Sequence, residues 1–80
     1  MKIPVIKQLC ETYTIEDLQQ AEDDLLNERP LTIAVEGNDE GEQLTHILAA
    51  IWCLNDIKVN NSNVGQAVRN YSVKVRNSIG

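Results

Sequence analysis

The sequence has few of the side chains on which most catalytic and metal sites depend. It contains one histidine, two cysteines and three aromatic residues, and it has no phenylalanine. One histidine cannot complete the usual four-ligand zinc site without nearby cysteines, and no nucleophile stands beside it to form a catalytic pair. The cysteines also lack a Cys-x-x-Cys spacing. We therefore predict a protein that is not an enzyme and that holds no cofactor or metal.

Long apolar runs are also absent. No stretch approaches the roughly 18 apolar residues that a membrane-spanning helix needs. Pro4, Lys7 and Gln8 interrupt the first ten residues, where a signal peptide would carry apolar sequence. Ordinary proportions of apolar (42%) and charged (24%) side chains fit a single globular domain over residues 1–80. We expect a cytoplasmic protein with reduced thiols and no membrane partner.

Positive charge is scarce and confined to one end. Up to Asn63 the chain carries twelve acidic and four basic side chains, whereas from Val64 onward it has three basic and no acidic ones. The net charge of −5 argues against a general nucleic-acid binder, because phosphate contacts need clustered lysine and arginine. Weak nucleic-acid binding through Arg69, Lys74 and Arg76 on the C-terminal helix is kept as an alternative.

Helix signals divide most of the chain. Pro4 suits a first helical turn, and Thr14 with Asp17 resembles a capping box that would begin a second helix. Asp39 with Glu42 gives the same signal for a third helix. The spacing of apolar residues then predicts a mainly α-helical fold, a compact arrangement of four helices at 4–13, 15–28, 40–59 and 63–79.

The segment 31–36 follows a different period. Leu31, Ile33 and Val35 alternate with less apolar residues, which is the spacing of a strand. A lone strand needs a pairing partner, which would be residues 1–6 or a second copy of the same segment. We favour an extended connection here, with a short β segment as the alternative.

The third helix contains the most unusual stretch. From Ile47 to Leu54 every residue is apolar, so little of the helix circumference would be wetted there. The other helices are short and need their charged faces in water, so we expect them to leave part of this stretch uncovered. A soluble monomer seldom exposes such an area, and a homodimer or a higher even oligomer would cover it. The residues expected at this interface are Leu48, Ala49, Ile51 and Trp52.

The same pattern carries expectations about stability and charge. Leu48 and Ile51 are expected to be core residues, so replacing either with alanine should cost on the order of 2–5 kcal/mol. The basic C-terminal helix, with Arg69, Lys74 and Arg76, is expected to face an acidic partner. The acidic helix at 15–28 of a neighbouring subunit would serve.

Two local clusters resemble sites but have simpler explanations. His46 and Glu42 form an i,i+4 pair that could supply two metal ligands, yet a place at the margin of the core, or a hydrogen bond to Glu42, explains His46 better. The acidic loop 36–42 lacks the register of a calcium loop and the lysine of a phosphate loop. Cys10 and Cys53 are expected to be small buried apolar residues.

The opening MKIPVIKQL, the centre EGEQLTHILAAIW and the closing AVRNYSVKVRNSIG resemble a family of short bacterial proteins of unknown function. The resemblance covers nearly the whole chain, and its most specific parts are the start, Met-Lys-x-Pro-Val-Ile-Lys, and the end, Val-Arg-Asn-Ser-Ile. It implies no catalytic residues, because the family has no established activity. It also implies that some relatives are encoded near thioredoxin-like genes.

The function that these observations favour is a small, non-enzymatic, self-associating module that also binds an unidentified protein partner. The alternative is a thiol-linked accessory protein of a thioredoxin-type redox system, which would act through Cys10 or Cys53. The two hypotheses differ in a testable way, because only the second requires a thiol that reacts in the folded protein.

Overall fold

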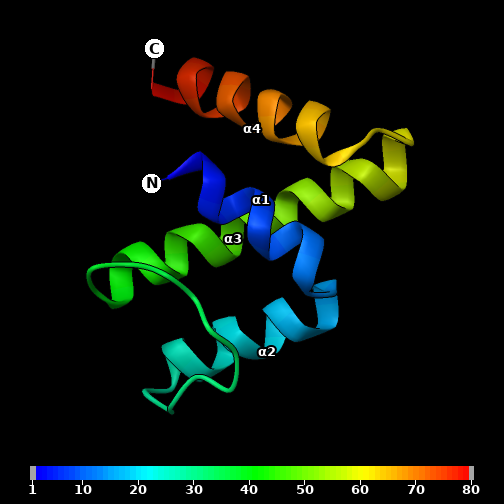
Figure 1. Ribbon diagram of the computed structural model, residues 1–80. Coiled ribbons are helices and arrows are strands. Elements are labelled where there is room, and N and C mark those ends of the chain that lie inside the picture. Colours follow the sequence, from blue (N-terminus) through cyan, green and yellow to red (C-terminus); the bar gives the residue numbers. More distant parts are fainter. Residues whose placement is uncertain (1, 80) are drawn as a thin grey trace.

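The computed structural model describes residues 2–79, and it confirms the mainly α-helical prediction. Among these residues the chain forms four helices and no strand (Figure 1). None of the described helices is both long enough and apolar enough to cross a membrane. The helices are α1 (Ile3–Thr12), α2 (Ile15–Leu26), α3 (Glu40–Asn60) and α4 (Val64–Ile79).

Side-chain caps fix the starts of α2 and α4. Thr14 and Asp17 form the predicted capping box, in which each side chain accepts a hydrogen bond at 3.2 Å from the backbone amide of the other. At α4 the Asn63 side chain accepts from the Gln66 amide at 2.9 Å. Both helices therefore begin where a short polar side chain can satisfy an amide that the helix leaves unpaired.

The start of α3 differs slightly from the predicted capping box. Asp39 accepts from the Glu42 amide at 2.8 Å, as expected, but the Glu42 carboxylate accepts from the Asn38 amide at 3.1 Å instead of reaching back to Asp39. The turn before the helix lies tightly against its first turn. A Cβ atom on Gly37 would come within 2.8 Å of the Gln43 backbone nitrogen, so only glycine fits there.

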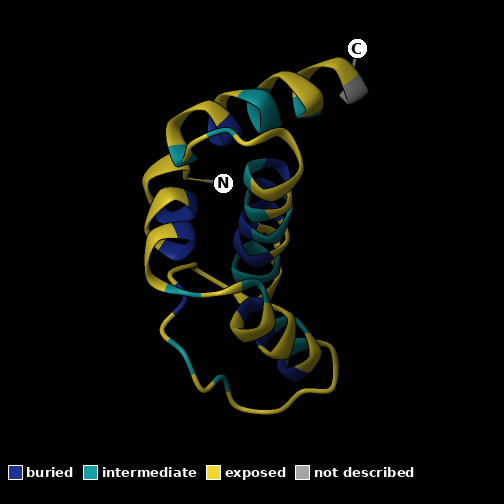
Figure 2. Ribbon diagram, turned by 90° about the vertical axis from the view of Figure 1, so that its right-hand side faces the viewer, coloured by how far each residue is buried: buried dark blue, intermediate teal, exposed yellow. Residues whose placement is uncertain are grey.

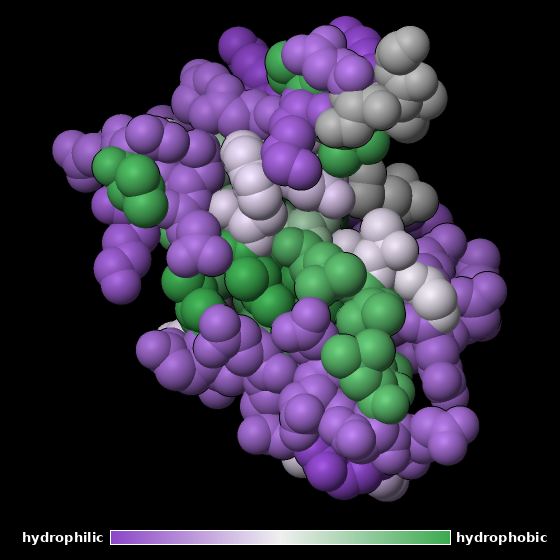
Figure 3. All heavy atoms as spheres, turned by 180° about the vertical axis from the view of Figure 1, so that it is seen from behind, coloured by the Kyte–Doolittle hydropathy of each residue, from purple (hydrophilic) through white to green (hydrophobic). Residues whose placement is uncertain are grey.

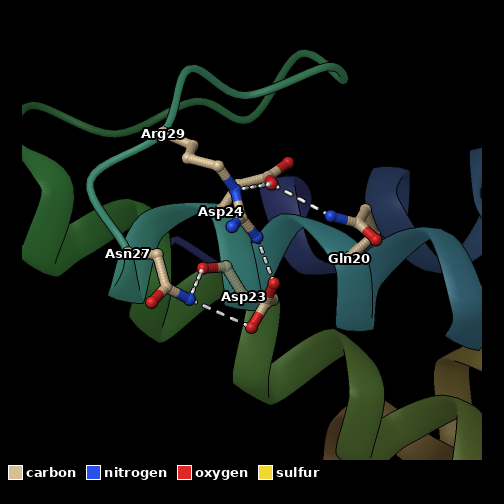
Figure 4. A network of polar contacts seen from close by, with 5 residues as sticks. All are labelled: Gln20, Asp23, Asp24, Asn27 and Arg29. Atoms are coloured by element: carbon tan, nitrogen blue, oxygen red, sulfur yellow. Dashed lines mark hydrogen bonds and ion pairs between the residues drawn. The ribbon is translucent and has the colours of Figure 1, made fainter.

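The end of α2 is held by a polar network that the sequence did not indicate (Figure 4). The helix stops at Leu26 rather than at position 28, and the Arg29 amide donates to the Asp24 carbonyl at 2.7 Å. The Arg29 side chain pairs with Asp23 and, at 3.2 Å, with Asp24 Oδ1, which also accepts from Gln20 at 3.0 Å. Asp24 is only 4% exposed, so it does not belong to the solvated acidic face of α2.

The segment 31–36 is an extended connection, and the alternative of a β segment was wrong. Leu31 and Ile33 are half-buried and Val35 is buried, while the residues between them are exposed. The Val35 carbonyl accepts from the Gln43 side chain at 2.9 Å, not from another strand. The alternation in the sequence therefore reports burial on one side of an extended chain, which a strand and a packed connection share.

α3 is the centre of the packing. It contacts α1, α2 and α4, whereas α2 and α4 lie at opposite ends of the molecule (Figure 1). Buried residues line the facing sides of α1 and α3 (Figure 2). The buried core is drawn from all four helices and the 31–36 connection, and it comprises Val5, Ile6, Leu9, Cys10, Leu18, Ala21, Val35, Ile47, Ala49, Ala50, Cys53, Ala67 and Val68.

Candidate interaction surface

The side of α3 that faces away from the core carries several apolar side chains. Leu48 is 43% exposed, so the expectation that it is a core residue was wrong. Ile51 and Trp52 are half-buried rather than fully buried, and Leu44, one turn before Leu48, is half-buried on the same side. We call Leu44, Leu48, Ile51 and Trp52 the exposed apolar face.

Seen from behind, apolar side chains form a continuous area across the middle of the molecule, where α3 runs (Figure 3). Hydrophilic side chains surround this area on several sides. Trp52 lies at its border with α4, because its ring packs on Tyr71 with the ring centroids 5.6 Å apart. Trp52 is therefore partly committed to packing within the chain, which leaves Leu48 as the most exposed apolar side chain of the face.

Ala49 does not belong to this surface, contrary to the prediction. It is fully buried, as is Ala50. The helical repeat places positions 46, 49, 50 and 53 on the inner side of α3 and Leu48 on the outer side. The two alanines are small where α3 meets its own neighbours, so they serve packing within the monomer. The sequence could not settle this, because no polar residue between Ile47 and Leu54 marks a wet side.

The predicted basic residues lie on a different helix from the exposed apolar face. Arg69, Lys74 and Arg76 are exposed on α4. α4 packs against α1 and α3 and does not contact α2 within the described residues. The basic α4 and the acidic α2 are thus separated in space as well as in sequence. A contact between these two helices has to be intermolecular.

His46 is a structural residue rather than a ligand. It is fully buried, Nδ1 lies 2.8 Å from the Glu36 carbonyl oxygen, and Nε2 accepts from the Lys2 amide at 3.0 Å. Nδ1 therefore carries the proton and donates it, so the ring is neutral and both nitrogens are used. The expected hydrogen bond to Glu42 was wrong. His46 joins the start of α1 and the connection before α3 to the middle of the fold.

The surroundings of His46 are hollowed. A hollow of about 360 Å³ is lined by Lys2, residues 35–38, Glu42 and His46. Its acid and amide groups are largely engaged in holding the turn before α3. No group of three or more His, Cys, Asp or Glu side chains is placed to hold a metal ion in the part of the chain that the structure describes.

A second buried polar group, which the sequence did not suggest, fixes the turn between α3 and α4. The Asp56 carboxylate accepts hydrogen bonds from Asn60 (2.6 Å), Ser62 (3.2 Å) and Asn70 (3.0 Å). These bonds, that of Asn70 first, lower the pKa of Asp56 although burial opposes the shift. Because Asn70 belongs to α4, the network sets the orientation of α4 on α3.

The two cysteines are buried, Cys10 on α1 and Cys53 on α3. The Cys10 thiol donates to the Ala50 carbonyl at 3.5 Å, and Cys53 is one turn beyond Ala50 on the same helix. Both are buried, as predicted. No sequence signal marked the contact of Cys10 with Ala50, because that contact depends on how two helices cross.

The model of one protein family matches residues 1–80, the full length of the chain, and that family is described as a family of unknown function, DUF6952. The chain belongs to this family. No curated protein and no solved structure matches it. The resemblance to a family without established activity is thereby confirmed, while the bacterial origin and the shared N-terminal motif remain predictions. Membership in DUF6952 assigns no site, so function has to be argued from the surface itself.

Proposed function

We propose that this member of DUF6952 is a non-enzymatic interaction module that binds a second copy of itself through the exposed apolar face. The observation that carries the proposal is the position of Leu48, which is 43% exposed on the outer side of the central helix. Leu44 and Ile51 flank it and are only half-covered by their own chain. Covering such an area removes apolar surface from water, which is the main favourable term in protein association.

Charge favours a second copy as the occupant. The acidic α2 and the basic α4 lie at opposite ends of the molecule (Figure 1). A two-fold axis through the exposed apolar face makes a self-complementary interface, in which α4 of one subunit approaches α2 of the other. Arg69, Lys74 and Arg76 would then face acids at the rim. Such exposed pairs add little affinity but set orientation and suppress wrong partners.

The cellular setting of the proposal is the cytoplasm. Two reduced cysteines in one small domain suit a reducing compartment. A further protein partner would bind surfaces that the dimer leaves free. No feature of the described residues favours the nucleic-acid alternative over self-association.

The oligomeric state tests the proposal directly. Light scattering after size-exclusion chromatography at tens of micromolar should give a mass of about twice the 9.0 kDa chain. Leu48→Lys should shift the protein to the monomer, because a lysine there would be desolvated opposite its own symmetry mate. Its matched control is Ile3→Lys, which places the same charge at a 36% exposed position on α1, on the opposite side of α3 from the exposed apolar face, and should leave the mass unchanged.

The circular dichroism spectra of both variants should match that of the wild type, because neither position is in the core. A wild-type mass near 9.0 kDa at that concentration would refute self-association. Equal loss of dimer in both variants would place the interface elsewhere.

A further inference from the structure

Four side chains form a line along the outer side of α3. Leu44, Leu48, Ile51 and Asn55 follow one another at steps of four, three and four residues, which keeps them on one side of a helix. All four are exposed or half-buried, so each has surface to offer outside the monomer. The line therefore adds one polar residue, Asn55, to the exposed apolar face.

Asn55 limits how a second chain can cover this face. It is exposed, and its side chain makes no hydrogen bond within the described residues. An asparagine between two helices costs affinity when it meets apolar groups, whereas a second asparagine opposite it supplies both a donor and an acceptor. A covered Asn55 is therefore satisfied best by its own copy.

The two helices beside α3 carry opposite charges. α2 and α4 lie on opposite sides of α3 in both ribbon views (Figures 1 and 2). Every charged residue of α2 is acidic, and every charged residue of α4 is basic. The direction in which a second copy binds therefore decides whether acid meets base or acid meets acid.

A two-fold axis can lie in the interface along α3 or across it. An axis along α3 makes the two α3 helices parallel and exchanges their sides, so α4 of each subunit lies next to α2 of the other. An axis across α3 makes the helices antiparallel and keeps the sides, so the two acidic helices face each other. If antiparallel helices cross at Leu48, the two copies of Asn55 stand roughly 20 Å apart along the helix axis.

We propose that the exposed apolar face binds a second copy with the two α3 helices parallel and in register. Leu48 then meets Leu48 of the partner subunit, and Asn55 meets Asn55 of the partner subunit. The inference rests on the proposed self-association and adds which part of the second copy covers the face, and in which direction. Asn55 specifies this direction at a cost in affinity.

The ends of α3 oppose the parallel direction, but only slightly. Parallel helices align their dipoles and bring Glu40 and Lys58 near their own copies. Both residues are exposed, where water and salt screen such repulsion. The antiparallel direction would instead set the several acidic residues of one α2 against those of another, so the helices beside α3 outweigh its ends.

Engineered cysteines test the direction in the full-length chain. Leu44→Cys should form a disulfide-linked dimer with itself on oxidation by copper phenanthroline, because parallel helices hold the two copies of position 44 side by side. Antiparallel helices that cross at Leu48 would separate them by roughly 12 Å, beyond the about 7 Å between Cα atoms that a disulfide spans. Leu48→Cys should link in either direction, and the wild type, whose cysteines are buried, should not link.

A mixture of two variants tests the antiparallel direction. Leu44→Cys is mixed with ¹⁵N-labelled Ile51→Cys, so that a linked pair of unlike subunits has its own mass. Positions 44 and 51 face each other only in antiparallel helices, and this mixed product should be absent. Adding Asn55→Leu to both variants should keep the dimer but make the mixed product appear, because the residue that specifies direction is gone.

The outcomes separate this proposal from self-association itself. If Leu48→Cys links while Leu44→Cys stays unlinked, or if the mixed product forms with Asn55 in place, the face binds a second copy in the other direction and the proposal is overturned. An unchanged product pattern in the Asn55→Leu pair would overturn the role of Asn55. A Leu48→Cys that never links, in a protein of doubled mass, would refute the exposed apolar face as the interface and with it the proposed function.

Discussion

The inner and outer sides of α3 make an instructive pair. The inner side carries two polar side chains, His46 at 0% and Asp56 at 9% exposure, whereas the outer side carries Leu48 at 43%. Around this helix, some polar side chains are buried and an apolar side chain is exposed, which is the opposite of the usual arrangement. The difference teaches that the inner polar groups are tolerated because each is fully hydrogen-bonded, and that the outer apolar groups need a reason outside the monomer.

The largest expected effect on stability comes from truncating a buried residue on the inner side of α3. Ile47→Ala should lower the free energy of unfolding by about 2–5 kcal/mol, because Ile47 is fully buried and its truncation leaves a cavity. Leu48→Ala, at the adjacent exposed position, should cost well under about 1 kcal/mol in the monomer. Urea melts of both variants measure the difference in the free energy of unfolding, at a protein concentration below the dissociation constant of the dimer. Equal midpoints would mean that the two sides have been assigned wrongly.

The next effect removes a polar group from the inner side. His46→Leu should cost about 1–3 kcal/mol, because the Lys2 amide and the Glu36 carbonyl would lose their partner. Urea melts give the free energy. The ¹⁵N chemical shifts of the wild-type ring test the cause: they should show a neutral ring protonated at Nδ1. A ring protonated at Nε2 would contradict the assigned hydrogen bonds.

The effect at Asp56 depends on pH. Its folded-state pKa lies below the ordinary value of 3.8, so the carboxylate contributes stability above about pH 4. This contribution is lost as the pH falls through the lower, folded pKa. Asp56→Asn should therefore be less stable than the wild type at pH 7, and the gap should narrow below pH 4. Thermal melts across this range measure the gap, and a gap that is constant with pH would exclude the carboxylate as its origin.

The smallest effect serves as the reference for the others. Glu22→Gln on α2 changes a charge that makes no hydrogen bond or ion pair in the described structure, and its stability should stay within about 0.5 kcal/mol of the wild type. The same urea melts apply. A larger change would show that the acidic face of α2 contributes to folding beyond its solubility.

Much of the fold could be predicted because helix starts are local. Thr14, Asp39 and Asn63 satisfy amides only three residues away, so each start is written in four consecutive residues. The candidate surface was only partly predictable. Leu48, Ile51 and Trp52 were identified from an apolar run, but Ala49 was assigned to the wrong side and Leu44 was missed. Leu44 lies four residues before Leu48, and this spacing, which places both residues on one side of a helix, could have identified it.

The sequence by itself determined the number, order and approximate limits of the helices, because caps and apolar spacing act over one or two turns. It also determined the scarcity of catalytic side chains and the separation of acidic from basic residues. Only the tertiary structure decided which side of α3 is buried, that His46 bonds to Lys2 across 44 positions, and that the Cys10 thiol bonds to the Ala50 carbonyl of α3. These contacts depend on how helices cross, and the crossing is fixed by packing among all four helices at once rather than by any local pattern.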